Sequence, residues 1–151
     1  MLTTDANKAL YEQDFYLWIQ TTVKLLRERN LEQLDIDNLI EEIDSMGRSE
    51  KKELKTRLVV LIEHLLKLQF WIAEKDYNAR GWRQTVVDQR RQILYTLADS
   101  PSLKFIFNDI FVDCYTDARK DTIRKYQLSS ELFPEQPPFS LEQVLNADFI
   151  P

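Results

Sequence analysis

The stretch DIDNLIEEIDSMGRSEKKELKTRLVVLIEHLLKLQFW, residues 35–71, decides the fold. Apolar side chains recur in it every three or four residues, which is the spacing of one face of an α-helix. The members of this apolar stripe are Ile36, Leu39, Ile43, Met46, Leu54, Leu58, Leu61, Leu65, Leu68 and Ile72. The stripe keeps its phase across Gly47, so the sequence predicts one helix over about 35–73. A helix end at Gly47 is the alternative.

Three charged or titratable side chains interrupt this stripe at intervals of seven residues: Glu50, Arg57 and His64. Because burying an unpaired charge is unfavourable, these side chains need partners from one another or from a neighbouring helix. The column is interpreted either as a structural polar seam that fixes the register of the helices or as a recessed binding site. The sequence leaves both interpretations open.

Before this stretch, the sequence predicts an N-terminal arm over residues 1 to about 11, part of which can be helical, and then a helix from Tyr11 to about Asn30. A short connector, residues 31–34, favours an antiparallel arrangement of this helix and the long one. In an antiparallel pair, residues at equal distances from the connector lie side by side, which places Trp18 beside Gly47. We therefore expect Gly47 to have a packing role.

After this stretch, a loop is expected at about 73–79, followed by a helix from about 79 or 82 to 98. Ser100 and Pro101 form a helix-start signal for another helix that ends near Tyr126. Prolines then exclude regular helix until Ser140 and Gln143 form a capping box for a last short helix; these prolines are Pro134, Pro137 and Pro138. The predicted fold is all-α, a bundle of four main helices with a long second helix and a short C-terminal helix.

Two polar residues, Gln89 and Arg90, also fall on the apolar side of their helix. If this helix runs antiparallel to the long one, residues at equal distances from the expected 74–79 loop lie side by side. Gln89 and Arg90 are then beside Glu63 and His64, where each polar group would find a partner. This cluster is the candidate site. Its members are Glu50, Arg57, Glu63, His64, Gln89 and Arg90.

Length and composition indicate one globular domain over residues 1–151. Hydrophobic residues make up 44% of the chain, and its two glycines suit helices. The formal charge of −5 argues against a general nucleic-acid binder. Cys114 is the single cysteine and fits a helix core. With no targeting segment and no long apolar run, we expect a cytoplasmic protein that is not in the membrane.

The sequence contains no recognisable catalytic or metal-binding motif. His64 is the single histidine and has no glutamate three residues before it, so the di-metal pattern of helical bundles is not met. No phosphate-binding loop or nucleophile motif is present. We therefore expect no metal and no cofactor. An enzyme with a site around His64 and Arg90 stays an open alternative.

Basic residues near Trp82 suggest a second alternative, contact with nucleic acid. Arg80, Arg83 and Arg91 could bind phosphate while Trp82 stacks on a base. The competing interpretation places Trp82 in the core.

Several segments in order along the chain resemble the DUF29 family, a group of small bacterial proteins common in cyanobacteria. They are YEQDFYLWIQ, LIEEIDSMGRSEKKELKTRL, LIEHLLK, GWRQTVVDQRRQI, DSPSLK and FPEQPPFSLEQVLNADFIP. The resemblance runs from Tyr11 to Pro151. It implies an all-helical fold and supplies no catalytic residue, substrate or cofactor.

The functional prediction is a helical module that binds a protein partner or forms a homodimer. Its basis is the broad apolar face of the long helix and of the helix that follows Pro101, which together exceed what a chain of this length is expected to cover.

Overall fold

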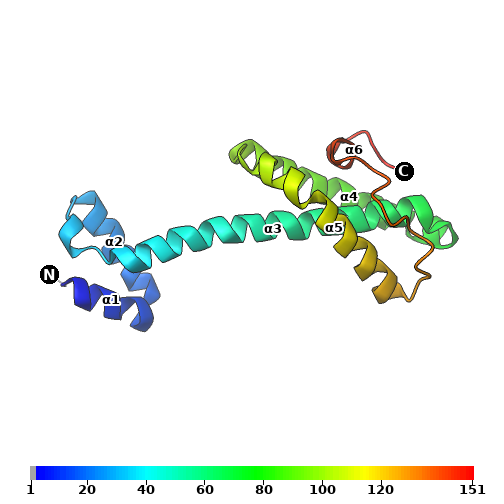
Figure 1. The fold of residues 1–151 in the computed structure, drawn as a ribbon. Helices are drawn as coiled ribbons and strands as arrows, with labels where there is room; N and C mark the ends of the chain where they lie inside the picture. Colours follow the sequence, from blue (N-terminus) through cyan, green and yellow to red (C-terminus); the bar gives the residue numbers. More distant parts are fainter. Residues whose placement is uncertain (1–2) are drawn as a thin grey trace. The chain divides into compact units, whose positions relative to one another are not determined.

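The computed structural model describes residues 3–151, and the regular structure in this range is entirely helical, with no strand (Figure 1). The helices are α1 (Thr4–Gln13), α2 (Phe15–Arg27), α3 (Ile36–Phe70), α4 (Ile72–Asp99), α5 (Leu103–Tyr126) and α6 (Leu141–Leu145), with a 3₁₀ turn η1 (Leu31–Gln33). The predicted all-α class is confirmed, and the predicted long second helix is α3.

Contacts group the chain into two compact units, which we call the N-terminal unit (Met1–Ser49) and the C-terminal unit (Glu50–Pro151). α3 contributes residues to both, and it is helical at Gly47. The alternative of a helix end at Gly47 is therefore excluded. The single domain expected over residues 1–151 stays a prediction.

In the N-terminal unit, Asp14 separates α1 from α2. The sequence had predicted an arm followed by one helix in this region. Asp14 is extended rather than helical (φ −151°, ψ 86°), and its carboxylate accepts a hydrogen bond from the Leu17 backbone N–H at 3.0 Å. This is an N-cap, so α2 begins afresh at Phe15. The expected helix start at Tyr11 was wrong, because Tyr11 lies in α1 and the apolar spacing continues through the break.

The expected contact of Trp18 with Gly47 was also wrong. The buried Trp18 indole donates to the carboxylate of Asp35 at 3.1 Å, and Asp35 also accepts from the Asn38 side chain at 2.6 Å. Asp35 directly precedes α3, so Trp18 is held at the start of that helix. A Cβ placed on Gly47 meets no atom within 4 Å, and Gly47 therefore has no packing role inside its unit.

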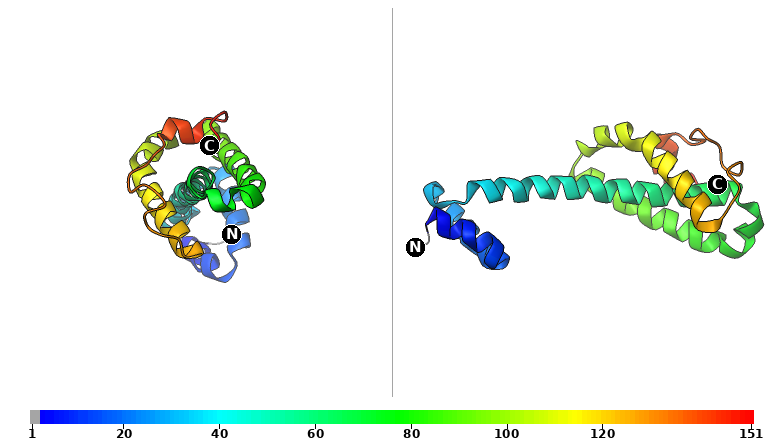
Figure 2. Two further views of the ribbon diagram at one scale, coloured as in Figure 1. Left: turned by 90° about the vertical axis from the view of Figure 1, so that its right-hand side faces the viewer. Right: turned by 60° about the horizontal axis from the view of Figure 1, so that its bottom comes forward.

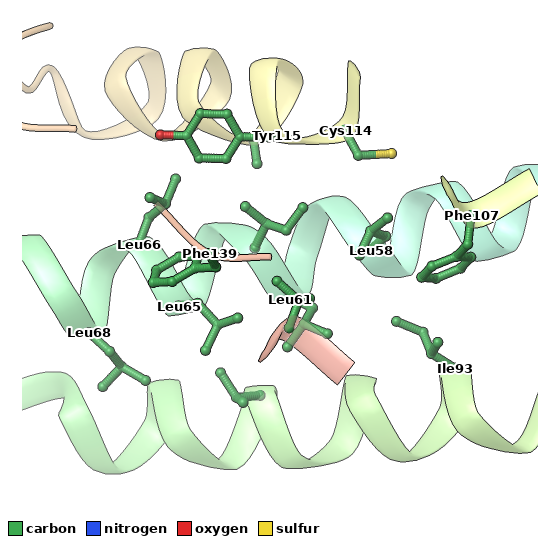
Figure 3. Packing of buried hydrophobic residues seen from close by; sticks show 14 of the residues in the cluster. Leu58, Leu61, Leu65, Leu66, Leu68, Ile93, Phe107, Cys114, Tyr115 and Phe139 are labelled. Carbon is green, nitrogen blue, oxygen red and sulfur yellow. The ribbon is translucent and has the colours of Figure 1, made fainter. Parts of the chain in front are cut away.

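In the C-terminal unit, the second part of α3 lies between α4 and α5 (Figures 1 and 2). Leu58, Leu61 and Leu65 project from α3 into the core, Ile93 faces them from α4, and Phe107 and Tyr115 face them from α5 (Figure 3). From Leu61 to Leu68 every α3 residue except His64 is buried. The helix is enclosed on nearly all sides here, not on one face alone.

The loop expected at about 73–79 was wrong, because these residues form the first turns of α4. Trp71 alone reverses the chain (φ −92°, ψ 67°), and its N–H donates to the Lys67 carbonyl at 3.0 Å. The residues after it are polar because that part of α4 is largely exposed to solvent. The reversal therefore comes earlier than expected, which changes the register between α3 and α4.

The C-terminal segment packs back onto the C-terminal unit. α5 ends at Tyr126 as predicted, and Gln127 adopts the left-handed conformation (φ 53°) that commonly ends helices. Arg119 then donates to the carbonyls of Phe133 at 3.1 Å and Ser130 at 2.5 Å. The predicted capping box is confirmed, since Ser140 and Gln143 each bond the other's backbone N–H ahead of α6.

Candidate functional site

The six residues predicted to form one polar cluster fall into four places: Arg57 contacts Gln89, Glu63 and His64 both lie beside Lys67, and Glu50 and Arg90 are each apart from the others. Glu50 is exposed at the start of the C-terminal unit. Arg57 is half-buried and donates to Glu53 at 2.8 and 3.1 Å and to the Gln89 side chain at 3.2 Å. Gln89 therefore pairs with Arg57 rather than with Glu63. The expected pairing was wrong because the chain reverses at Trp71 and not at 74–79.

Arg90 does not meet His64 either. This residue is 3% exposed, and its guanidinium donates from Nε to the Val144 carbonyl and from Nη2 to the Phe149 carbonyl, both at 2.9 Å. Burial lowers the pKa of Arg90 from its ordinary value. Arg90 therefore holds the C-terminal segment, and the expected contact between Arg90 and His64 is wrong.

A different polar cluster occupies the end of α3, and we call it the Glu63–Lys67 cluster. Glu63 and Lys67 are both nearly fully buried, with 3.8 Å between Nζ and Oε1. Lys125 of α5 approaches the other carboxylate oxygen of Glu63 at 3.2 Å, and its own side chain is largely exposed. Glu63 is thus a buried carboxylate between two ammonium groups.

Aromatic rings surround the Lys67 ammonium. Its Nζ lies 5.3 Å from the centre of the Trp82 ring and 5.1 Å from that of Tyr126, distances at which a cation is attracted to a ring face. Trp71 stacks on Trp82 with 5.7 Å between ring centres, and it also contacts Tyr126 at 5.0 Å. The positive charge is therefore enclosed by rings from α4 and α5 together with Trp71.

His64 borders this cluster. Its Nδ1 lies 2.8 Å from the Val60 carbonyl, and its Nε2 lies 3.4 Å from Lys67 Nζ. Because the ammonium is a donor, Nε2 accepts and Nδ1 carries the proton that is donated to Val60. Desolvation is the main cause that lowers the pKa of His64, and the Lys67 charge lowers it further. Glu63, His64 and Lys67 therefore each have a polar partner in or beside the cluster.

Sequence reasoning missed Lys67, Trp71, Lys125 and Tyr126 as members of this cluster. Glu63 and Lys67 are four residues apart and resemble an exposed helical ion pair. The signal that could have found them is the composition of residues 58–68, LVVLIEHLLKL, because a helix that is apolar on nearly all sides is buried on nearly all sides. Charges in such a segment must lie inside.

The structure also locates the other groups that the sequence singled out: possible metal ligands, the Cys114 thiol and the basic residues near Trp82. Within residues 3–151, no group of three His, Cys, Asp or Glu side chains could hold a metal ion. Cys114 is buried in the core, and desolvation raises the pKa of its thiol to about 11. Arg80, Arg83 and Arg91 are exposed on α4. Trp82, which the nucleic-acid interpretation needs for stacking on bases, is buried against Trp71.

An apolar surface in the N-terminal unit was also unexpected, since the sequence placed three of its members in a buried stripe. We call it the α3 stripe. Its side chains are Ile36, Ile40, Ile43 and Met46, which are 46%, 60%, 61% and 66% exposed. Their spacing places them along one side of the helix. The expectation that Ile36, Ile43 and Met46 are buried was wrong, because the buried core around α3 belongs to the C-terminal unit and begins at Leu54.

A family model described as "Domain of unknown function DUF29" matches residues 10–150. No curated protein and no solved structure matches the chain. Among the helices of the described residues, none is both long and apolar enough to cross a membrane.

Proposed function

We propose that this chain, which belongs to the DUF29 family, is a protein-interaction module that pairs with a second copy of itself. The description of the family assigns no activity, so the proposal rests on the structure. The observation that carries this proposal is the exposed α3 stripe. Four large apolar side chains along one side of a helix form the kind of surface that helices bury against other helices.

Contacts inside the N-terminal unit leave the stripe free. α1 reaches α3 through an ion pair of Lys8 with Asp37 at 3.2 Å and a hydrogen bond from Tyr11 to Glu42. At 100° per residue, Asp37 and Glu42 lie on opposite sides of the stripe and away from its centre. α1 therefore packs beside and behind the stripe and does not cover it.

The stripe is complementary to itself when two copies run antiparallel. With Ile40 of one copy facing Ile43 of the other, Ile36 faces Gly47, so a large side chain meets a small one. The same register brings Asp37 of each copy towards Arg48 of the other. Arg48 already bridges Glu41 at 3.0 Å and Asp44 in its own chain, which limits repulsion among these acids.

This arrangement gives Gly47 a packing role between the two copies. An interior helical glycine is about 1 kcal/mol less favourable than alanine, and the space beside this one is open in the structure. Opposite Ile36 of a second copy, the missing side chain allows the two helices to approach closely. Such small-against-large pairing resembles the fitting of side chains in coiled coils.

The expected affinity is modest. Each stripe side chain is already about half covered, so burying the rest contributes roughly 1 kcal/mol, or about 8 kcal/mol for the eight side chains of a pair. Association itself costs on the order of 4–15 kcal/mol. The burial therefore exceeds the cost of association by about 4 kcal/mol at most, which corresponds to a dissociation constant of about 1 mM, so the dimer must be sought up to millimolar concentrations.

Sedimentation equilibrium over such a range tests the proposal. The wild type should show a monomer–dimer equilibrium, and the double substitution Ile40→Ser, Ile43→Ser should shift it to monomer. Ile72→Ser is the matched control, because Ile72 is 63% exposed but lies on α4. A wild type that stays monomeric at several times the expected dissociation constant of about 1 mM refutes self-pairing, and an effect of Ile72→Ser equal to that of the double variant refutes the assigned surface.

A compensating pair of substitutions tests the register. Gly47→Leu should weaken the dimer by placing a large side chain against Ile36, and adding Ile36→Ala should restore it. If Gly47→Leu strengthens association, or if the second substitution weakens it further, the antiparallel register is wrong.

A further inference from the structure

A pocket of about 310 Å³ lies on the C-terminal unit between α4 and the C-terminal segment. Its walls are Val87, Arg90, Arg91, Leu94, Tyr95 and Ala147. Two consecutive arginines stand among apolar and aromatic side chains, and no acidic residue lines the space. A small pocket of this kind suits a ligand with one charged end and an apolar body.

Arg90 is the unusual part of this wall. Two of its nitrogens donate to the Val144 and Phe149 carbonyls, whereas Nη1 is shielded from solvent and has no hydrogen-bond partner in the described part of the chain. None of the ion pairs formed within residues 3–151 involves this guanidinium, although it is 3% exposed. A buried positive charge of this kind is unfavourable until an anion lies near it.

Arg91 supplies a second, adaptable charge. Its side chain is more than half exposed, and Arg91 Nη1 is 4.0 Å from the Asp88 carboxylate, at the limit of an ion pair. Such an exposed contact contributes little and can be exchanged for a ligand. The exposed Arg91 guanidinium favours planar anions such as carboxylates, because its forked N–H groups match the two oxygens, and the buried Arg90 charge adjoins the same space.

We infer that this pocket binds a small carboxylic acid, with its carboxylate towards Arg90 and Arg91 and its hydrocarbon body against Val87, Leu94 and Ala147. The inference is independent of the α3 stripe and of self-pairing. The carboxylate can belong to a free acid or to the C-terminus of a peptide, and these two sources share the chemistry that the pocket recognises.

Ligand-detected NMR and calorimetry with the full chain test the inference. The probes are benzoate and 3-methylbutanoate as free acids, a short peptide that ends in leucine, the same peptide with an amidated C-terminus, and benzamide as the uncharged counterpart of benzoate. A free acid should bind while benzamide does not. Binding of the acid peptide but not of the free acids assigns the site to peptide C-termini and supports the same chemistry.

Substitutions locate the binding. Arg91→Gln should weaken benzoate binding by about tenfold, the effect of losing one charge-assisted contact, and Arg83→Gln on the same helix should leave it unchanged. Arg90→Gln should abolish binding, and Ala147→Phe, which fills the pocket from an exposed position, should abolish it even if Arg90→Gln fails to fold. Failure of all carboxylates to bind at millimolar concentration overturns the inference, as does binding that survives both Arg91→Gln and Ala147→Phe.

Discussion

Replacing Lys67 by methionine should destabilise the C-terminal unit, although methionine is the more apolar residue and also unbranched. Lys67 is 2% exposed and lies between Glu63 and the rings of Trp82 and Tyr126. Its removal leaves the buried Glu63 carboxylate with Lys125 as its nearest cation. The destabilisation would come from the Glu63 charge that remains buried and not from a loss of packing at residue 67.

The size of the effect follows from these contacts. Breaking a buried ion pair by removing one partner typically costs about 3–5 kcal/mol. Lys125 at 3.2 Å still compensates part of the Glu63 charge, which places the expectation at the lower end. The lost cation–π contacts add about 1 kcal/mol, of which the methionine sulfur recovers part through its own contacts with the rings. We therefore expect a loss of about 3 kcal/mol.

Removing both charges should be much less harmful. In the double variant Glu63→Leu, Lys67→Met no charge of the pair stays buried, and apolar replacement of a buried ion pair is often neutral or stabilising. The double variant should therefore be more stable than Lys67→Met alone by about 2 kcal/mol.

Urea unfolding followed by tryptophan fluorescence and circular dichroism measures these differences, since Trp71 and Trp82 lie at the cluster. Lys52→Met, an exposed lysine on the same helix, is the control and should stay within about 0.5 kcal/mol of the wild type. A Lys67→Met protein as stable as this control would refute the reasoning. So would a double variant no more stable than Lys67→Met.

Three further measurements follow. The folded-state pKa of His64 lies below its ordinary value of 6.5, so the unfolded chain binds more protons than the folded protein just below that pH. The unfolding free energy should therefore fall as the pH drops from 7 to 5, and His64→Gln should flatten this slope. Gly47→Ala should raise the unfolding free energy of dilute, monomeric protein by about 1 kcal/mol, since no atom obstructs a Cβ there, and a loss in thermal melting would contradict this. Cys114 should react with a thiol reagent at pH 8 only on unfolding, because its thiol is buried and its pKa is raised to about 11; rapid reaction of the native protein would show that α5 opens readily.

The parts of the fold that rest on local spacing could be predicted from the sequence. α3 was expected over about 35–73 and covers Ile36–Phe70, because its apolar stripe repeats with the helical period. The capping box before α6 is likewise a pattern of neighbouring residues. Asp14 was overlooked because a single capping residue leaves the apolar spacing of α1 and α2 unchanged.

The start of α4 could not be predicted in the same way. Polar residues after Trp71 indicate a loop as readily as an exposed helical turn, and neither glycine nor proline marks the reversal at Trp71. That one boundary set the register between α3 and α4, so the expected neighbours of Gln89 and Arg90 were wrong as well. Arg57 and Gln89 do meet across the two helices, but the cluster that encloses a charge depends on Tyr126 and Lys125, which are distant in the sequence.

The way in which the C-terminal segment is held affects which substitutions it can accept. Arg90 and Arg119 bond the carbonyls of Ser130, Phe133, Val144 and Phe149, and every amino acid, proline included, offers the same carbonyl. The anchoring is therefore indifferent to side-chain identity, and the segment can diverge in sequence without losing its attachment wherever its side chains are exposed, as at Ser130. Selection on this part of the chain would act through Arg90, Arg119 and Tyr115, whose hydroxyl donates to the Pro134 carbonyl, and through the few buried side chains, such as Phe133 and Val144, that fill the core.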